Sequence, residues 1–214
     1  TEADEKAEAI ILPGLADLTP GIPVVAEESV AAGRIPEIGS GPFWLVDPLD
    51  GTKEFIKRNG EFTVNIGLIV DGIPSAGVVL APARKVLWSG AAGKAFREDE
   101  AGRAAIACRP LPARNAVVMT SRSHRNPESM DQWLAQFPGA SLDFAGSSLK
   151  FCLVAEGAAD LYPRFGPTCE WDTAAASAVL IAAGGRVTTF DGAPLAYGKS
   201  PKFLNPDFVA RGGT

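Results

Sequence analysis

A short segment, Asp47-Pro48-Leu49-Asp50-Gly51-Thr52, places two carboxylates three residues apart directly after the apolar run 43–46. Proline biases the residue before it toward extended backbone, so Pro48 is expected to keep Asp47 extended at the end of a strand. Gly51 permits backbone angles that a side chain would disfavour. The turn can therefore direct both carboxylates and the backbone carbonyl of Leu49 toward one point. Thr52 is expected to cap a short helix over 53–56.

Further acids follow other predicted elements. Glu27-Glu28-Ser29 comes directly after the apolar run 23–26, and Asp172 opens an alanine-rich segment that predicts a helix over 172–183. Strand ends and helix starts are where a fold presents side chains to a shared cleft. Carboxylates in one cleft repel one another, and a hard cation such as Mg²⁺ relieves that repulsion. The pattern indicates a magnesium site, and a helix N-terminus beside it would favour phosphate.

Each acid also has a purely structural interpretation. Asp-Gly is a common turn dipeptide, and Asp172 alone is typical of a helix N-cap. Glu27 and Glu28 alone are typical of a solvated pair. Only the combination of these acids with a specific motif distinguishes a metal site from ordinary turns and caps.

Composition restricts the class of protein. The 214 residues are 46% hydrophobic and 21% charged, which is typical of one large or two small globular domains. The net charge of -5 argues against binding of a nucleic acid polymer, which needs a basic surface. Bound cations would still allow an acidic chain to bind a small phosphorylated molecule.

The sequence gives only indirect evidence on the cellular compartment of the protein. Three cysteines, Cys108, Cys152 and Cys169, form no Cys-x-x-Cys pair, so neither a disulfide framework nor a zinc site is expected. The longest apolar stretch, 174–183, is too short for a transmembrane segment, and no signal peptide is visible. We expect a cytoplasmic protein, with peripheral association at the inner face of the membrane and the oligomeric state both left open.

The predicted elements divide the chain into two parts. The first half contains a helix over 2–15 that ends near Pro13-Gly14, then strands at 23–26, 43–46, 62–70, 76–81 and 85–95. Local hairpins, one turning at Asp71-Gly72, favour an antiparallel sheet. The second half alternates strands at 117–119, 160–162 and a final one at 186–189 with helices at 127–137, 147–156 and 172–183. A boundary near 109–112 gives an α+β unit over 1–112 and an α/β unit over 113–214.

Four motifs together resemble the inositol monophosphatase superfamily. The segment 43–52 resembles its first signature, and Glu170-Trp171-Asp172-Thr173-Ala174-Ala175 resembles its second. Val25-Ala26-Glu27-Glu28-Ser29 resembles the upstream acidic motif, and Thr1-Glu2-Ala3-Asp4 resembles the Thr-x-x-Asp motif. All four occur in the family's order over the whole chain. The resemblance implies an α/β (α+β) fold, a layered αβαβα sandwich.

Finer features resemble the 3'(2'),5'-bisphosphate nucleotidases of the bacterial CysQ type. These are the continuation Lys53-Glu54-Phe55 and the segments 146–157 and 161–168. The resemblance implies a role in sulfur metabolism and a reaction that removes the 3'-phosphate of adenosine 3',5'-bisphosphate to give AMP. An inositol monophosphatase or another sugar phosphatase of the same superfamily stays an alternative. A non-catalytic binding protein with the same fold is a third.

The resemblance also implies a role for each matching residue. Two or three Mg²⁺ ions are assigned to Glu27, Asp47, Asp50, Asp172 and the carbonyl of Leu49. Thr52, backed by Asp4 and together with Glu27, is assigned to orienting and activating the attacking water. Substrate contacts are assigned to Glu27, Leu49, Asp50, Gly51, Thr52, Ser147, Lys150, Arg164 and Asp172.

Three of these assignments have structural alternatives. Lys150 and Arg164 suit the 5'-phosphate, but they could equally be a solvated helix residue and a surface ion-pair partner. The loop 121–124 resembles a nucleotide-contacting loop, but its histidine, His124, could equally be an ordinary loop residue. The chain departs from the family pattern at Ala176, where glycine is usual, and a methyl group there is expected to crowd the helix packing.

Overall fold

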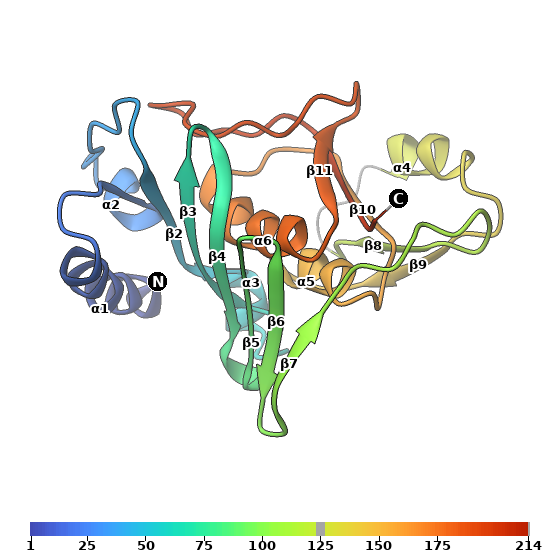
Figure 1. Ribbon diagram of the computed structural model, residues 1–214, viewed down its shortest axis with the longest axis horizontal. Coiled ribbons are helices and arrows are strands. Elements are labelled where there is room, and N and C mark those ends of the chain that lie inside the picture. Colours follow the sequence, from blue (N-terminus) through green and yellow to red (C-terminus); the bar gives the residue numbers. More distant parts are fainter. Residues whose placement is uncertain (123–126, 214) are drawn as a thin grey trace.

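Two β-sheets organise the computed structural model, which describes residues 1–122 and 127–213 (Figure 1). The first sheet follows chain order: β1 Val24–Ala26, β2 Phe43–Asp50, β3 Thr63–Val70, β4 Ile73–Ala81, β5 Val86–Ala91, β6 Lys94–Asp99 and β7 Gly102–Ile106. The second has the order β11 Arg186–Thr189, β12 Phe208–Arg211, β10 Leu161–Arg164, β8 Val117–Thr120 and β9 Ser141–Phe144.

Hairpins build the first sheet, as predicted. Its neighbouring strands pair antiparallel except β1 and β2, which are parallel. β3 alternates buried and half-buried residues along its length, the pattern of a strand with one face on the core. Asp71 and Gly72 have φ angles of 52° and 73°. A two-residue hairpin turn requires these left-handed conformations, so the predicted turn is confirmed.

Helices separate and cover the sheets. α1 Glu2–Leu18 and α2 Glu27–Ala31 lie outside the first sheet, while α5 Leu149–Ala155 and α6 Glu170–Ala182 lie between the sheets (Figure 1). α4 Pro127–Leu134 covers the other face of the second sheet, where Trp133 and Leu134 pack near Val118 and Leu161. Two short helices, α3 Thr52–Ile56 and η1 Pro82–Arg84, complete the elements described. The layers run helix, sheet, helix, sheet, helix, so the predicted αβαβα sandwich is confirmed.

Three neighbouring glycines allow α6 to pack closely against the first sheet. Gly67, Gly77 and Gly90 are cross-strand partners on β3, β4 and β5. A Cβ atom on Gly77 would lie 2.1 Å from the carbonyl oxygen of Ala175, and one on Gly90 would lie 2.6 Å from the Cα of Val179. The glycines therefore let the backbone of the helix approach that of the sheet. Ala176, where the family pattern has glycine, is buried inside a continuous α6.

Several predicted boundaries are wrong. α1 runs through Pro13 to Leu18 instead of ending near Gly14. Leu15, beyond the proline, packs with Ala26 and Val46, so tertiary packing offsets the helix-breaking effect of proline. The predicted strand 85–95 is two strands, β5 and β6. β7, β9 and β12 were not predicted, so 186–189 is not the final strand. β7 and β9 are short edge strands with few buried residues, and they depend on their neighbours more than on their own pattern.

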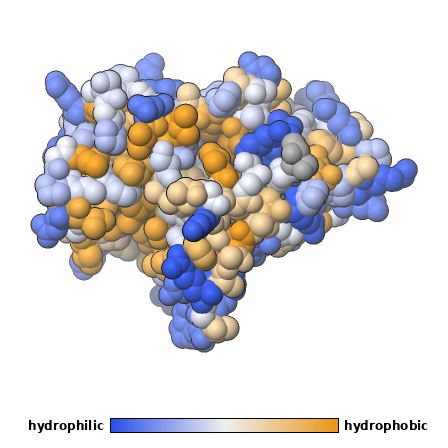
Figure 2. All heavy atoms as spheres, viewed as in Figure 1, coloured by the Kyte–Doolittle hydropathy of each residue, from blue (hydrophilic) through white to orange (hydrophobic). Residues whose placement is uncertain are grey.

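An apolar groove of about 500 Å³ lies on the outer face of the first sheet beside α1, lined in part by Leu18, Trp44, Ile66, Val78 and Phe96. Figure 2 shows apolar side chains gathered over this side of the molecule. Within residues 1–122 and 127–213, no helix is long and apolar enough to cross a membrane.

Candidate functional site

Three of the predicted acids lie at one end of two adjacent strands. Ala26 pairs with Val46 in the parallel β1–β2 ladder. Glu27 and Asp47, the next residues, therefore leave the ladder at the same end. The register of β2 against β3 shifts between Asp47 and Asp50, an irregularity of the kind that re-aims side chains at the rim of a sheet.

Asp172 reaches this end of the sheet from α6. It is the third residue of that helix, and its Oδ2 accepts a hydrogen bond of 2.8 Å from the backbone N–H of Cys169, which is the N-cap. The interpretation of Asp172 as the N-cap itself is therefore wrong, although its carboxylate does cap the first turn. α6 begins at Glu170, two residues earlier than predicted.

Backbone N–H groups fix one oxygen of each aspartate. Asp47 Oδ1 accepts from Leu49 at 2.9 Å, and Asp50 Oδ2 accepts from Ser148 at 2.7 Å. Asp172 is held in the same way from Cys169. Because each carboxylate is anchored through one oxygen, its orientation toward its neighbours is set by the backbone.

The acids interact strongly with one another. Burial, and then the neighbouring carboxylates, raise the pKa of Asp172 to about 7. Burial likewise raises the pKa of Glu27 to about 7, although a hydrogen bond with Asp47 partly offsets this. The pKa of Asp47 lies well above its ordinary value, through complete burial and then repulsion from Asp50, Glu27 and Asp172. Burial raises the pKa of Asp50 as well. The raised pKa values mean that the four carboxylates destabilise one another when they are ionised, and that a nearby positive charge would relieve this repulsion.

The donor chemistry of this cluster fits a hard divalent cation. The side chains offered are carboxylates, which Mg²⁺ prefers, and their raised pKa values report a site where added positive charge is favourable. Among the described residues, no three His, Cys, Asp or Glu side chains already surround one point closely enough to enclose an ion. The acids thus form an electrostatically coupled cluster and not a closed coordination shell. The direction of the Leu49 carbonyl stays a prediction.

A cleft of about 330 Å³ opens beside the acids. The predicted site residues that line it are Asp50, Gly51, Thr52, Ser147, Lys150, Arg164 and Asp172. Glu27, Asp47 and Leu49 lie outside this lining, and Asp47 is only 1% exposed. Ser121 also lines the cleft. Arg122, the next residue of the predicted nucleotide loop, donates to Glu61. Ser123 and His124 lie outside the described residues.

Thr52 and Asp4 come together from distant parts of the chain. The Thr52 hydroxyl donates to Asp4 Oδ1 at 3.5 Å, and Asp4 is 3% exposed on α1. The N-cap of α3 is Gly51, with φ at 91°, and Thr52 is the first helical residue. The prediction that Thr52 is the N-cap is therefore wrong, because its hydroxyl points to Asp4 and not to its own helix.

The two predicted basic residues differ in their surroundings. The Lys150 ammonium is buried and donates to the carbonyls of Ala145 at 3.3 Å and Ser147 at 2.5 Å. Burial lowers the pKa of Lys150 to about 8, against the opposing effect of Asp50. Arg164 donates through Nη2 to the carbonyl of Pro167 at 3.1 Å. Its buried Nε has no hydrogen-bond partner in the part of the chain that the structure describes.

A polar network that the sequence did not reveal supports Asp50. Ser148 donates to Asp50 through its backbone N–H and its hydroxyl, at 2.7 and 3.1 Å, and the hydroxyl lies 2.7 Å from Asn65 Oδ1. Glu61 accepts from the backbone N–H of Gly146 at 2.9 Å and from Arg122. Thr63 and Asn65 occupy buried positions of β3. Polar residues on the buried face of an alternating strand are the signal that could have revealed this network.

Comparison with known proteins agrees with the sequence motifs. Residues 1–207 match the model of the inositol monophosphatase family. The chain is 52% identical over 208 residues to the 3'(2'),5'-bisphosphate nucleotidase CysQ of Salmonella typhimurium, covering 97% of this chain and 83% of that protein.

Solved structures share the fold. A crystal structure of CysQ from Bacteroides thetaiotaomicron, a bacterial member of the inositol monophosphatase family, superposes with a TM-score of 0.84 at 39% identity, over 99% of this chain and 83% of that one. The inositol monophosphatase from Anabaena gives a TM-score of 0.82 at 28% identity, over 99% and 82%. The chain therefore belongs to the inositol monophosphatase family.

Proposed function

We propose that the chain is a Mg²⁺-dependent 3'(2'),5'-bisphosphate nucleotidase that removes the 3'-phosphate of adenosine 3',5'-bisphosphate and releases AMP and phosphate. The observation that carries this proposal is the coupled acid cluster of Glu27, Asp47, Asp50 and Asp172 beside a cleft that also holds Lys150 and Arg164. The 52% identity to a protein named for this activity supports the choice of substrate.

Four acids and one carbonyl would hold two or three Mg²⁺ ions: Glu27, Asp47, Asp50, Asp172 and Leu49. When bound, such cations lower the pKa of a water and neutralise charge on the phosphate oxygens. The backbone hydrogen bonds to Asp47, Asp50 and Asp172 keep their carboxylates oriented before substrate arrives. This prior orientation reduces the reorganisation required during the reaction.

Thr52 and Asp4 are proposed to orient the attacking water, with Glu27 beside them. Because the Thr52 hydroxyl donates its proton to Asp4, its oxygen lone pairs are directed to accept a hydrogen bond from water. A water held this way presents its own lone pair to the phosphorus.

Arg164, Lys150 and Ser147 are proposed to bind the remainder of the substrate. Arg164 lines the cleft, where its guanidinium can donate to a 5'-phosphate oxygen. Lys150 has three N–H donors, and two are used by the carbonyls of Ala145 and Ser147. Lys150 and Ser147 both line the cleft. Gly51 leaves room for Ser147, since a Cβ atom on Gly51 would lie 3.3 Å from that of Ser147.

We also propose that 1–112 and 113–214 are two sub-domains with the cleft between them. The first half supplies Asp4, Glu27, Asp47, Asp50 and Thr52. The second supplies Ser147, Lys150, Arg164 and Asp172. In the structure α6, from the second half, packs on the first sheet, so the units share one core.

A substrate panel tests the activity. Phosphate release is measured with and without Mg²⁺ from adenosine 3',5'-bisphosphate, 3'-AMP and inositol 1-phosphate. We expect Mg²⁺-dependent release, fastest from the bisphosphate. Faster release from inositol 1-phosphate would favour an inositol monophosphatase. No release from any phosphomonoester would favour a non-catalytic binding protein.

A further inference from the structure

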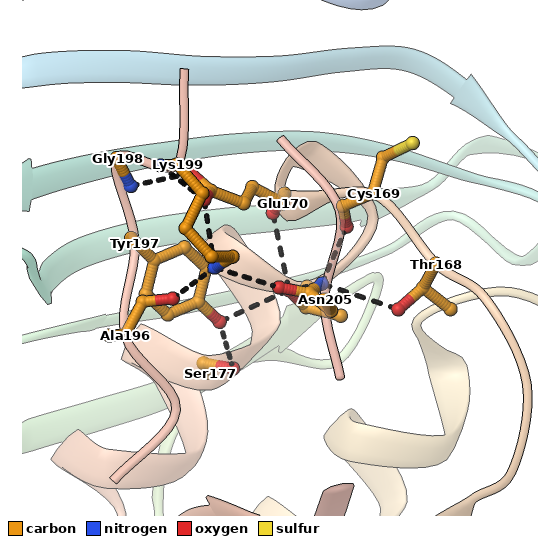
Figure 3. Close-up of polar contacts among 10 residues, drawn as sticks. Thr168, Cys169, Glu170, Ser177, Ala196, Tyr197, Gly198, Lys199 and Asn205 are labelled. Atoms are coloured by element: carbon orange, nitrogen blue, oxygen red, sulfur yellow. Dashed lines mark hydrogen bonds and ion pairs between the residues drawn. The ribbon is translucent and has the colours of Figure 1, made fainter. Parts of the chain in front are cut away.

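A cluster of buried polar side chains forms hydrogen bonds with the start of α6 (Figure 3). It is formed by an irregular segment near the C-terminus, residues 196–205, here called the C-terminal strap. The strap lies along the first two turns of α6 (Figure 3). The side chain of Asn205 points to Thr168 and Cys169 just before the helix, and the ring of Tyr197 points to Ser177 (Figure 3). None of these strap residues lines the cleft.

Glu170 is the centre of this cluster. Its side chain is completely buried and accepts hydrogen bonds from the backbone N–H groups of Gly198 at 2.7 Å and Lys199 at 2.8 Å. The ammonium of Lys199 forms an ion pair with the same carboxylate at 2.8 Å. A buried carboxylate is costly unless it is paired and hydrogen-bonded, and these three donors satisfy it. Glu170 is therefore held in one position relative to the strap.

The strap also holds the residues on both sides of Asp172. Before it, the carbonyl of Phe203 accepts from the N–H of Glu170 at 2.7 Å, and Asn205 Nδ2 donates to the carbonyl of Cys169 at 2.8 Å. After it, the hydroxyl of Thr173 contacts Asn205 at 3.0 Å and the Tyr197 hydroxyl at 3.1 Å.

Among the described residues, the only hydrogen bond that the structure shows for the Asp172 side chain is the capping bond from the N–H of Cys169. The strap holds Cys169, Glu170 and Thr173 through hydrogen bonds, so the Asp172 carboxylate between them stays directed to the cleft that it lines. We infer that Glu170 is a positioning residue, which transmits the fixed geometry of the strap to Asp172. This inference rests on the proposed role of Asp172 as a cation ligand.

The chain offers a matched control. Asp160 is also a completely buried carboxylate with a partly exposed basic partner. It accepts from Arg109 Nε at 2.6 Å, from Arg109 Nη2 at 2.7 Å and from the N–H of Val117 at 2.7 Å. Asp160 is absent from the lining of the cleft. Breaking this pair removes a similar buried interaction without touching the first turn of α6.

The experiment measures Mg²⁺ binding directly by isothermal titration calorimetry, on variants whose folding is verified by circular dichroism. The variants are Glu170→Gln, Lys199→Met and the control Arg109→Met. Glu170→Gln turns one acceptor into an NH₂ group that opposes a backbone N–H of the strap. We expect it to raise the Mg²⁺ dissociation constant about tenfold, the usual scale for groups that support metal ligands. Lys199→Met should weaken Mg²⁺ binding in the same direction, and Arg109→Met should stay within about twofold of wild type.

The outcomes separate this inference from the proposed function. A wild-type chain that binds no Mg²⁺ contradicts both. Mg²⁺ binding by the wild type with an unchanged dissociation constant in Glu170→Gln overturns the positioning role alone. An equal loss in Arg109→Met also overturns it, because the effect would then follow general destabilisation. If Glu170→Gln does not fold, the comparison of Lys199→Met with Arg109→Met decides the question.

Discussion

Replacing Gly77 by alanine should separate α6 from the first sheet. The added Cβ atom would lie 2.1 Å from the carbonyl oxygen of Ala175 and 2.8 Å from its carbonyl carbon, whereas ordinary contacts begin near 3.4 Å. Both groups belong to backbone, so the helix has to move by about 1 Å. Overpacking of a tight core costs about 1–3 kcal/mol and occasionally more. Because the clash is with backbone, we expect the free energy of unfolding to fall by about 3 kcal/mol.

The stability of the variant is measured by urea unfolding, and two substitutions calibrate the result. Gly41→Ala has nothing within 4 Å of the new Cβ atom, so its free energy of unfolding should stay within about 0.5 kcal/mol of wild type. Gly67→Ala meets the backbone nitrogen of Ala175 at 2.7 Å and should fall between the two. A graded series would show that the approach of α6 to β3 and β4 determines the cost.

The same change should reach the active site, because α6 carries Asp172. A displacement of about 1 Å at a reacting group costs about a hundredfold in rate. We expect Gly77→Ala to release phosphate about a hundredfold more slowly than wild type at saturating Mg²⁺, measured at a temperature where the variant is folded. A Gly77→Ala variant as stable as Gly41→Ala would refute the reasoning about helix seating. Full activity in a destabilised variant would refute the link from α6 to the site.

Three further predictions concern the acids and the cleft. Asp47→Asn should abolish Mg²⁺-dependent phosphate release and leave the metal-free chain at least as stable, because it removes a repelled buried charge; near-normal turnover would exclude Asp47 as a ligand. Without Mg²⁺, thermal unfolding should show stability falling as pH rises from about 4 to about 8, because Glu27 and Asp172 have folded-state pKa values raised to about 7 and their contribution is lost as they ionise. For half-buried Asp172 this contribution to the free energy of unfolding is about 2 kcal/mol after allowance for solvent screening. Saturating Mg²⁺ should remove the loss of stability at high pH. A flat stability profile without Mg²⁺ would contradict the mutual repulsion of the acids. Arg164→Gln should raise KM for adenosine 3',5'-bisphosphate about tenfold or more and leave KM for 3'-AMP nearly unchanged; equal effects on both substrates would show that Arg164 does not bind the 5'-phosphate.

The acidic motifs could be found in the sequence because their chemistry is local. Asp47 and Asp50 sit three residues apart around a proline and a glycine, and Glu27 and Asp172 each follow a recognisable start or end of an element. Hairpins with a turn such as Asp71-Gly72 are local in the same sense. These local features were enough to predict the antiparallel first sheet and the candidate acids, whereas the layered fold followed from the resemblance to the inositol monophosphatase superfamily.

Interactions between distant segments could not be predicted. The hydrogen bond between Ser148 and Asn65 joins residues 83 positions apart, and the bond from the strap at Gly198 to Glu170 spans 28. Neither pair forms a motif, because a serine or an asparagine acquires a partner only when the sheets and helices are assembled. The same reason explains why the short edge strands β7 and β9 were missed. They have no buried residues, so their pairing partners determine them more than their own pattern does.

The central claim is that Glu27, Asp47, Asp50 and Asp172 together hold the catalytic cations. The most direct test is a crystal structure of the chain soaked with Mn²⁺ in place of Mg²⁺ and with AMP and phosphate, in which anomalous scattering locates each ion. We predict ions bound by these four carboxylates, with the phosphate beside Thr52. Ions bound only elsewhere, or a cluster that stays empty at saturating Mn²⁺ while phosphate occupies the cleft, would contradict the account.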